Sequence, residues 1–109
     1  MKGSVYFIGD EAKQAFLALA AGRAEDQDIH GLLNEAFDRI AADAFCGTQV
    51  PKRLIPKTYF AKYGIDNLWK YNLKRNWRLM YTVAGDEMTV IALIIEWLPH
   101  KEYERRFGY

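Results

Sequence analysis

The sequence predicts an α+β domain in which a helical hairpin packs on one face of a mainly antiparallel sheet. Two stretches in the first half of the chain carry apolar residues at helical spacing, and three runs rich in β-branched and aromatic residues follow in the second half. With 109 residues, half of them hydrophobic, the chain is long enough for one core and leaves little for a second. We therefore expect a single domain over residues 1–109.

The first elements expected are a short strand and a helix. Residues 4–9, "SVYFIG", form a β-rich run that Gly9 closes, and Asp10 follows as a helix cap. The apolar residues of that helix recur at intervals of three and four, at Ala12, Ala15, Phe16 and Leu19. The helix is expected to end within residues 20–24, "AAGRA".

A second, longer helix is predicted over residues 25–45, and Gly47 follows it as a stop. Its apolar side chains form one stripe: Ile29, Leu32, Leu33, Ala36, Phe37, Ile40, Ala41, Ala44 and Phe45. The two helices are therefore predicted to form an antiparallel hairpin. Residues 47–66 contain two prolines and two glycines, which indicates a mostly irregular connection with room for one helical turn over residues 56–63.

Three strands are predicted next, over residues 68–73, 77–83 and 88–98. Residues 74–76 join the first pair, and residues 84–87, "AGDE", suit a tight turn between the second and third strands. The third strand is apolar on both faces, so it should lie centrally in the sheet. A short helix should close the chain, with Pro99 at its start and two arginines near its end, where the helix dipole favours cations.

The alternation of side chains along the strands assigns them to two faces. The first face carries the large groups that should cover the helices: Trp69, Tyr71, Leu73, Trp77, Leu79, Tyr81 and Val83. The second face, expected to be an open side of the sheet, receives Lys70, Asn72, Arg78, Met80 and Thr82, with Lys74 and Arg75 at the hairpin tip. Lys70 and Arg78 are therefore predicted to share one open face. A slip of one residue in register would reverse the two faces.

The formal net charge of +1 conceals an uneven distribution. Residues 1–49 carry four cations against eight anions, a net charge of −4, whereas residues 50–109 carry eleven cations against six anions, a net charge of +5. A protein with one basic face attracts polyanions through its local field, which extends about 10 Å at ordinary salt. Charge alone leaves an ordinary solvated surface as an equal alternative.

The remaining composition indicates a cytoplasmic protein without a cofactor. Cys46 is the only cysteine, so no intramolecular disulfide can form, and no Cys or His lies at metal-ligand spacing from it. The longest apolar run, over residues 90–95, is far shorter than the roughly 20 residues that cross a bilayer. The first residues have too short an apolar stretch for a signal peptide, so we expect no association with membranes.

Two segments resemble the RelE/ParE toxin superfamily: "LWKYNLKRNWRLMYTV", residues 68–83, and "HKEYERRFGY", residues 100–109. The first is similar to the "YRLVY"-type strand of RelE-like sequences, and the second to their late basic segment with a tyrosine. The resemblance implies a β-α-α-β-β-β-α fold. It also implies a cytoplasmic toxin of a type II toxin–antitoxin module, bound by a cognate antitoxin in a hetero-oligomer. The RelE branch cleaves messenger RNA in the decoding site of the ribosome, which contains 16S rRNA.

Carried onto this sequence, the resemblance makes Arg78 the strand arginine, Lys70 the basic residue of the preceding strand and Tyr103 the late tyrosine. Asn72 stands where some members have a second lysine. "LPHK" stands where some have a Gly-Lys-Arg segment, which makes His100 and Lys101 local candidates. The predicted catalytic residues are Arg78, His100, Tyr103 and Lys70. The residues predicted to contact RNA are Asn72, Lys74, Arg75, Lys101, Arg105 and Arg106.

The implied reaction is attack by an RNA 2′-hydroxyl on the adjacent phosphate, with the 5′-oxygen leaving and no metal involved. Arg78 is suited to neutralise the charge that builds on the phosphate, because its planar guanidinium binds two oxygens and stays protonated. Lys70 would add a point charge, and His100 would carry a proton, since imidazole titrates near neutrality. Tyr103 would stack on a base or orient a phosphate as readily as it would act as a base.

Two other functions stay open at this point. The ParE branch shares the fold and inhibits DNA gyrase, and a third kind of relative would bind RNA or a partner without cleaving anything. Each residue also has a plain structural interpretation. His100 would be a surface residue at a helix start, and Tyr103 and Phe107 would pack the last helix on the sheet. The charged residues of that helix, Glu102, Glu104, Arg105 and Arg106, would form a solvated face.

Overall fold

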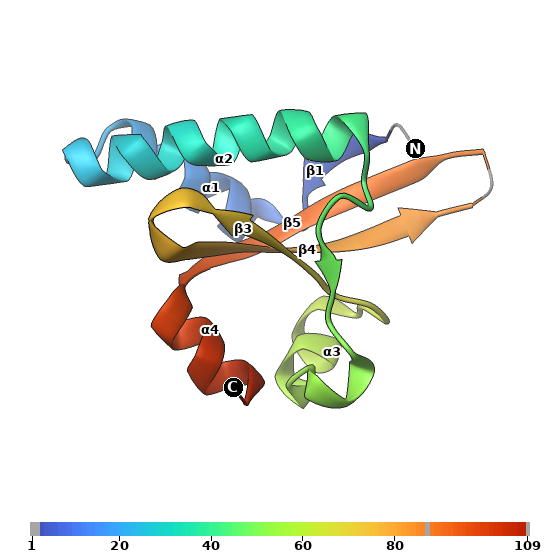
Figure 1. Ribbon diagram of the computed structural model, residues 1–109. Coiled ribbons are helices and arrows are strands. Elements are labelled where there is room, and N and C mark those ends of the chain that lie inside the picture. The colour runs from blue at the N-terminus through green and yellow to red at the C-terminus, as the bar shows by residue number, and fades with distance from the viewer. Residues whose placement is uncertain (1–2, 87, 109) are drawn as a thin grey trace.

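The computed structural model describes residues 3–86 and 88–108, and its chain path is shown in Figure 1. The elements are β1 (Ser4–Phe7), α1 (Asp10–Ala20), α2 (Ala24–Ala42), β2 (Thr48–Gln49), α3 (Lys57–Tyr63), β3 (Trp69–Leu73), β4 (Trp77–Gly85), β5 (Val90–Pro99) and α4 (His100–Phe107). The strands form one sheet in the order β1-β5-β4-β3-β2, in which only the β1–β5 pair is parallel among the described residues. The predicted α+β class with a mainly antiparallel sheet is confirmed.

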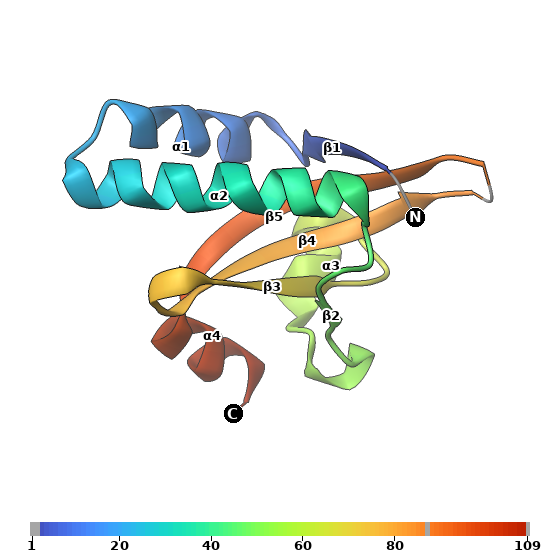
Figure 2. The same cartoon turned by 45° about the horizontal axis from the view of Figure 1, so that its top comes forward.

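Helices α1 and α2 lie antiparallel to each other on one face of the sheet, as Figure 2 shows. Side chains of α2 at Ile29, Leu33, Ala36 and Ile40 are buried there against the strands. All seven residues assigned to the helix-covered face take part in this first core, from Trp69 to Val83. The predicted helical hairpin and the predicted strand parity are therefore both confirmed.

The opposite face of the sheet is not open, which corrects the sequence-based expectation. Helices α3 and α4 cover it in Figure 1 and enclose a second core with Tyr59, Tyr103 and Phe107 at its centre. Met80 and Thr82, assigned to the open face, are 0% and 4% exposed. The cause is the aromatic content of residues 57–63 and of the terminal helix, which must be buried somewhere and meet each other on this face.

The element order also differs from the expected β-α-α-β-β-β-α. Strand β2, two residues long, pairs with β3, and α3 lies between them in the sequence. Both come from the segment that was expected to be mostly irregular, although α3 matches the single helical turn foreseen there. Helix α2 ends at Ala42, three residues early, because Asp43 turns to an extended conformation and its carboxylate accepts the Phe45 N–H at 3.0 Å.

The predicted turns after β3 and β4 are present, and both use left-handed backbone. Arg75 and Asn76, after β3, have φ of 63° and 61°, and the Arg75 guanidinium binds Asp28 of α2 at 2.8 Å. Gly85 ends β4 with φ of 127°, where a Cβ would lie 1.9 Å from the Thr89 carbonyl oxygen, so glycine is required. The second turn was predicted to include Glu87, which lies outside the described residues.

Strand β5 lies between β1 and β4, as its apolar sequence predicted, and it passes directly into α4. Helix α4 begins after Pro99 and ends at Phe107, and Gly108, which follows it, has a left-handed φ of 78°. In the described part of the chain, no helix combines the length and apolar character that crossing a membrane requires.

Candidate functional site

Arg78 and His100 meet where β5 becomes α4. Arg78 stands opposite Leu98 in the β4–β5 ladder, and His100 is the first residue of the helix that starts two positions later. The Arg78 Nη2 atom lies 2.8 Å from His100 Nδ1, although the residues are 22 apart in sequence. The register of the two strands therefore fixes this contact, and no long loop intervenes.

The hydrogen bond from Arg78 determines the tautomer of His100. A guanidinium has donors only, so Nδ1 must be the acceptor and the imidazole proton must be on Nε2. The Nε2 atom lies 2.7 Å from Glu104 Oε1, one helical turn along α4. The histidine is thus neutral and donates to a carboxylate while accepting from an arginine, which gives a chain Arg78–His100–Glu104.

Arg78 is held without a counter-charge. Its Nη1 donates to the Trp77 carbonyl at 3.1 Å, and its Nε is buried with no hydrogen-bond partner in residues 3–86 and 88–108. No carboxylate within the described residues forms an ion pair with it. A partly buried guanidinium with a free donor and no anion beside it is suited to bind an anionic ligand.

Lys70 and Tyr103 form a second pair on the same side of the sheet. The Lys70 Nζ lies 5.0 Å from the centroid of the Tyr103 ring, within the range of a cation–π contact. The Tyr103 ring is 1% exposed and stacks on Phe107 at 4.6 Å between centroids, so it belongs to the second core. In this arrangement Tyr103 positions Lys70, and its ring is not accessible for stacking on a nucleobase.

The residues predicted to contact RNA divide into two groups. Asn72, Lys74 and Lys101 are exposed, and their side chains make no hydrogen bond or ion pair within the described chain. The arginines are engaged by carboxylates: Arg75 by Asp28, and Arg105 and Arg106 by Glu102. The structure therefore pairs Arg78 with His100 and Lys70 with Tyr103 on one face of the sheet, and it directs the arginines of the last helical turn to carboxylates.

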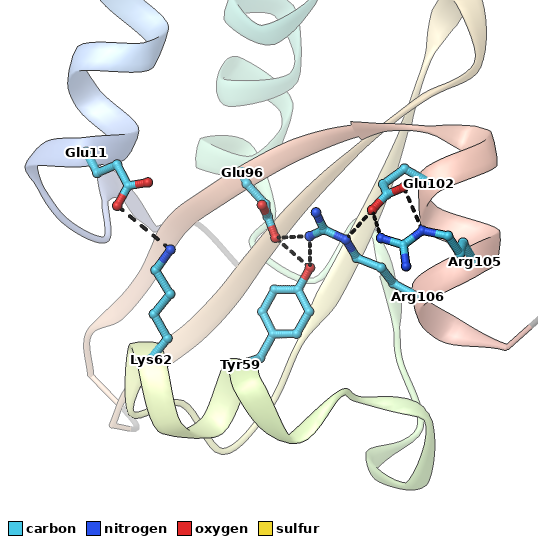
Figure 3. A network of polar contacts seen from close by, with 7 residues as sticks. All are labelled: Glu11, Tyr59, Lys62, Glu96, Glu102, Arg105 and Arg106. Atoms are coloured by element: carbon cyan, nitrogen blue, oxygen red, sulfur yellow. Dashed lines mark hydrogen bonds and ion pairs between the residues drawn. The ribbon is translucent and has the colours of Figure 1, made fainter.

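A polar network fixes α4 to the rest of the molecule, as Figure 3 shows. The Tyr59 hydroxyl of α3 donates to Glu96 Oε2 of β5 at 2.5 Å, and Arg106 Nη1 of α4 lies 3.2 Å from both groups. Burial, reinforced by Glu96, raises the pKa of Tyr59 well above its usual range. The network thus joins three elements and holds the helix that carries His100.

The outer part of this network ends at Glu102. Arg106 Nε donates to it at 2.7 Å, and Arg105 Nε donates to it at 3.0 Å. These hydrogen bonds from the two guanidinium groups lower the pKa of the Glu102 carboxyl to about 2. The plain interpretation of Arg106 as a surface residue is incomplete, because it connects α4 to Glu96 and Tyr59, whereas Arg105 binds Glu102 of the same helix.

Sequence reasoning missed Glu104 and the Tyr59–Glu96 contact. Glu104 was detectable, because it follows His100 by four residues on one helical face. Tyr59 and Glu96 are 37 residues apart and carried no signal. Among residues 3–86 and 88–108, no cluster of three or more His, Cys, Asp or Glu side chains is placed to hold a metal ion.

Comparisons with models of protein families, with curated proteins and with solved structures find no significant match to this chain. The functional argument therefore depends on the geometry around Arg78 and His100.

Proposed function

We propose that this chain is the toxin of a type II toxin–antitoxin module. It acts as a RelE-like endoribonuclease that cleaves messenger RNA on the ribosome, and a cognate antitoxin silences it. The observation that carries the proposal is the Arg78 guanidinium, which lacks a carboxylate partner among the described residues and contacts a neutral histidine. A cation and a proton acceptor in direct contact are the two groups that attack by a 2′-hydroxyl on phosphate requires.

The chemistry divides among these side chains. Arg78 neutralises the charge that builds on the phosphate, and Lys70, held against the Tyr103 ring, adds a second positive charge. His100 accepts the proton of the 2′-hydroxyl. Lys74, after β3, and Lys101, beside His100 in the sequence, are both exposed and supply contacts to the backbone of the RNA.

Three features of the chain depart from the RelE-like pattern. RelE-like element order requires setting aside β2 and α3, and the buried Tyr103 ring supports Lys70 where the family's tyrosine was expected to touch RNA. Asn72 in place of a lysine also reduces the local charge. These departures favour, as a second candidate, a relative of the fold that binds RNA or gyrase without cleaving nucleic acid.

The test is inducible expression with and without the adjacent gene, followed by mapping of messenger RNA 5′ ends. The native chain should stop growth and produce breaks at fixed positions within codons. In the Arg78→Ala variant the rate of cleavage should fall by about 100-fold or more, which is the usual effect of removing a donor that stabilises transition-state charge.

Arg23→Ala is the matched control, because Arg23 is an exposed arginine at the start of α2, and α2 lies on the face of the sheet opposite α4 (Figure 1). It should cleave as the native chain does. Full cleavage by Arg78→Ala would refute the role of Arg78. DNA damage without codon-positioned breaks would refute the nuclease and support inhibition of gyrase. Normal growth with neither effect would support a protein that binds RNA or a partner without cleaving it.

A further inference from the structure

The nitrogen of His100 that would act as the base is occupied in the free protein. Nε2 carries the imidazole proton and faces Glu104, so Nδ1 is the only basic nitrogen, and Arg78 donates to it at 2.8 Å. We infer that Arg78 masks this base and that a phosphodiester unmasks it by drawing the guanidinium away. The inference rests on the proposed function for its last step, the proton transfer from RNA.

The guanidinium has a reason to exchange partners. When its partner changes from a neutral imidazole to an anionic phosphate oxygen, the guanidinium gains the attraction of an opposite charge, and bidentate pairs of arginine with phosphate are among the strong charge-assisted hydrogen bonds. Nε and Nη2 form one edge of the guanidinium, on which Nη2 binds His100 and Nε has no partner among the described residues. A phosphate that binds this edge with two oxygens replaces the bond to His100 and gives Nε the partner it lacks.

The Trp77 carbonyl limits how far the arginine moves. It accepts from Nη1 at 3.1 Å, on the other edge of the guanidinium, so that bond persists while the Nε–Nη2 edge changes partner. The movement is therefore a local rotation of one side chain. Strands β4 and β5 and helix α4 stay where their backbone pairing and the Figure 3 network hold them.

Glu104 determines which nitrogen of the released imidazole can accept a proton. Its carboxylate keeps the proton on Nε2 before the reaction and stabilises the imidazolium after it, so it is a positioning residue. The 2′-oxygen bonds to phosphorus as its proton passes to Nδ1. The bond from phosphorus to the 5′-oxygen breaks, and that oxygen takes a proton from water. Arg78 and the base thus become active together, only when phosphate is present.

The test reads the two imidazole nitrogens of His100 by ¹⁵N NMR at mildly alkaline pH. The probe is a 2′-deoxy trinucleotide, whose phosphodiesters carry charge and cannot be cleaved by this route. The free protein should show a protonated Nε2 and an Nδ1 that accepts a hydrogen bond. Saturation with the probe should move Nδ1 downfield, towards a nitrogen without a hydrogen bond, and leave Nε2 protonated.

The Arg78→Gln variant tests the two steps separately. Its amide can still donate a hydrogen bond to Nδ1, but it carries no charge with which to attract a phosphate. In this variant Nδ1 should stay at its free-protein position when the probe is added. An equal concentration of sodium chloride is the control for ionic strength and should leave the native Nδ1 signal unchanged. A proton on Nδ1 in the free native chain, or an Nδ1 signal that the probe does not move, would overturn the inference.

The inference and the proposed function fail separately. If the native protein cuts messenger RNA but its Nδ1 signal does not change when the probe is added, the nuclease proposal stands and the masked base is refuted. If the Nδ1 signal responds to the probe but no transcript is cut, the exchange of partners at Arg78 stands and the nuclease proposal is refuted.

Discussion

Replacing Tyr59 by phenylalanine removes one oxygen from the contact that joins α3, β5 and α4. That hydroxyl donates to Glu96 at 2.5 Å and lies 3.2 Å from Arg106 Nη1. A hydrogen bond to a charged group contributes about 1.5–3 kcal/mol. Glu96 keeps Arg106 at 3.2 Å, and its side chain is 26% exposed to water, so its carboxylate is not left unpaired. The loss should therefore fall near the lower bound, about 1–2 kcal/mol.

Urea denaturation followed by tryptophan fluorescence measures this loss. With a slope of about 2 kcal/mol per molar urea, in the middle of the range of about 1–3 that small proteins show, the midpoint should fall by about 0.5–1 M at an unchanged slope. Because α4 carries His100, the His100 Nδ1 signal should also broaden as the helix loosens.

Tyr71→Phe is the matched control, since Tyr71 is half-buried against the first core and its hydroxyl makes no hydrogen bond within the described residues. Its free energy of unfolding should stay within about 0.5 kcal/mol of that of the native chain. Equal midpoints for Tyr59→Phe and Tyr71→Phe would refute the view that the Figure 3 network holds α4.

Two further perturbations test polar contacts that stabilise the fold. The lowered pKa of Glu102, about 2 against an ordinary 4.5, stabilises the fold above pH 4.5, and this contribution is lost as the pH falls towards 2. Glu102→Gln should therefore lose less stability than the native chain over that interval in thermal unfolding, and equal acid sensitivity would contradict the pairing. Tyr81→Phe removes the hydroxyl that donates to the buried Ala44 carbonyl at 2.9 Å, which should cost about 1–3 kcal/mol in urea; an unchanged midpoint would exclude that bond as a stabilising contact.

The strand pairing around the site was predictable because side chains alternate along a strand. The apolar residues on either side of Arg78 leave one register in which they all face the helices, and that register places Lys70 and Arg78 on the same face of the sheet. The position of His100 followed from Pro99, which starts a helix immediately after the last strand. Periodicity and a helix-start signal are local, so one sequence was sufficient to read them.

The second core was not predictable by the same means. Met80 is fully buried only because α3 and α4 fold over the face on which it lies, and nothing near Met80 in the sequence marks that event. The partners of Arg106 were hidden for the same reason, since Tyr59 lies 47 residues away. A helix of seven residues such as α3 has little intrinsic stability and exists because its aromatic face is buried.

The parallel pairing of β1 with β5 has a consequence for synthesis of the chain. Ser4 stands opposite Ile91, so β1 leaves the ribosome more than 80 residues before the strand with which it pairs. Helices α1 and α2 emerge in that interval without the sheet that buries their apolar stripes. Contacts between such distant residues slow folding, so these apolar surfaces stay exposed to water until β5 has been made.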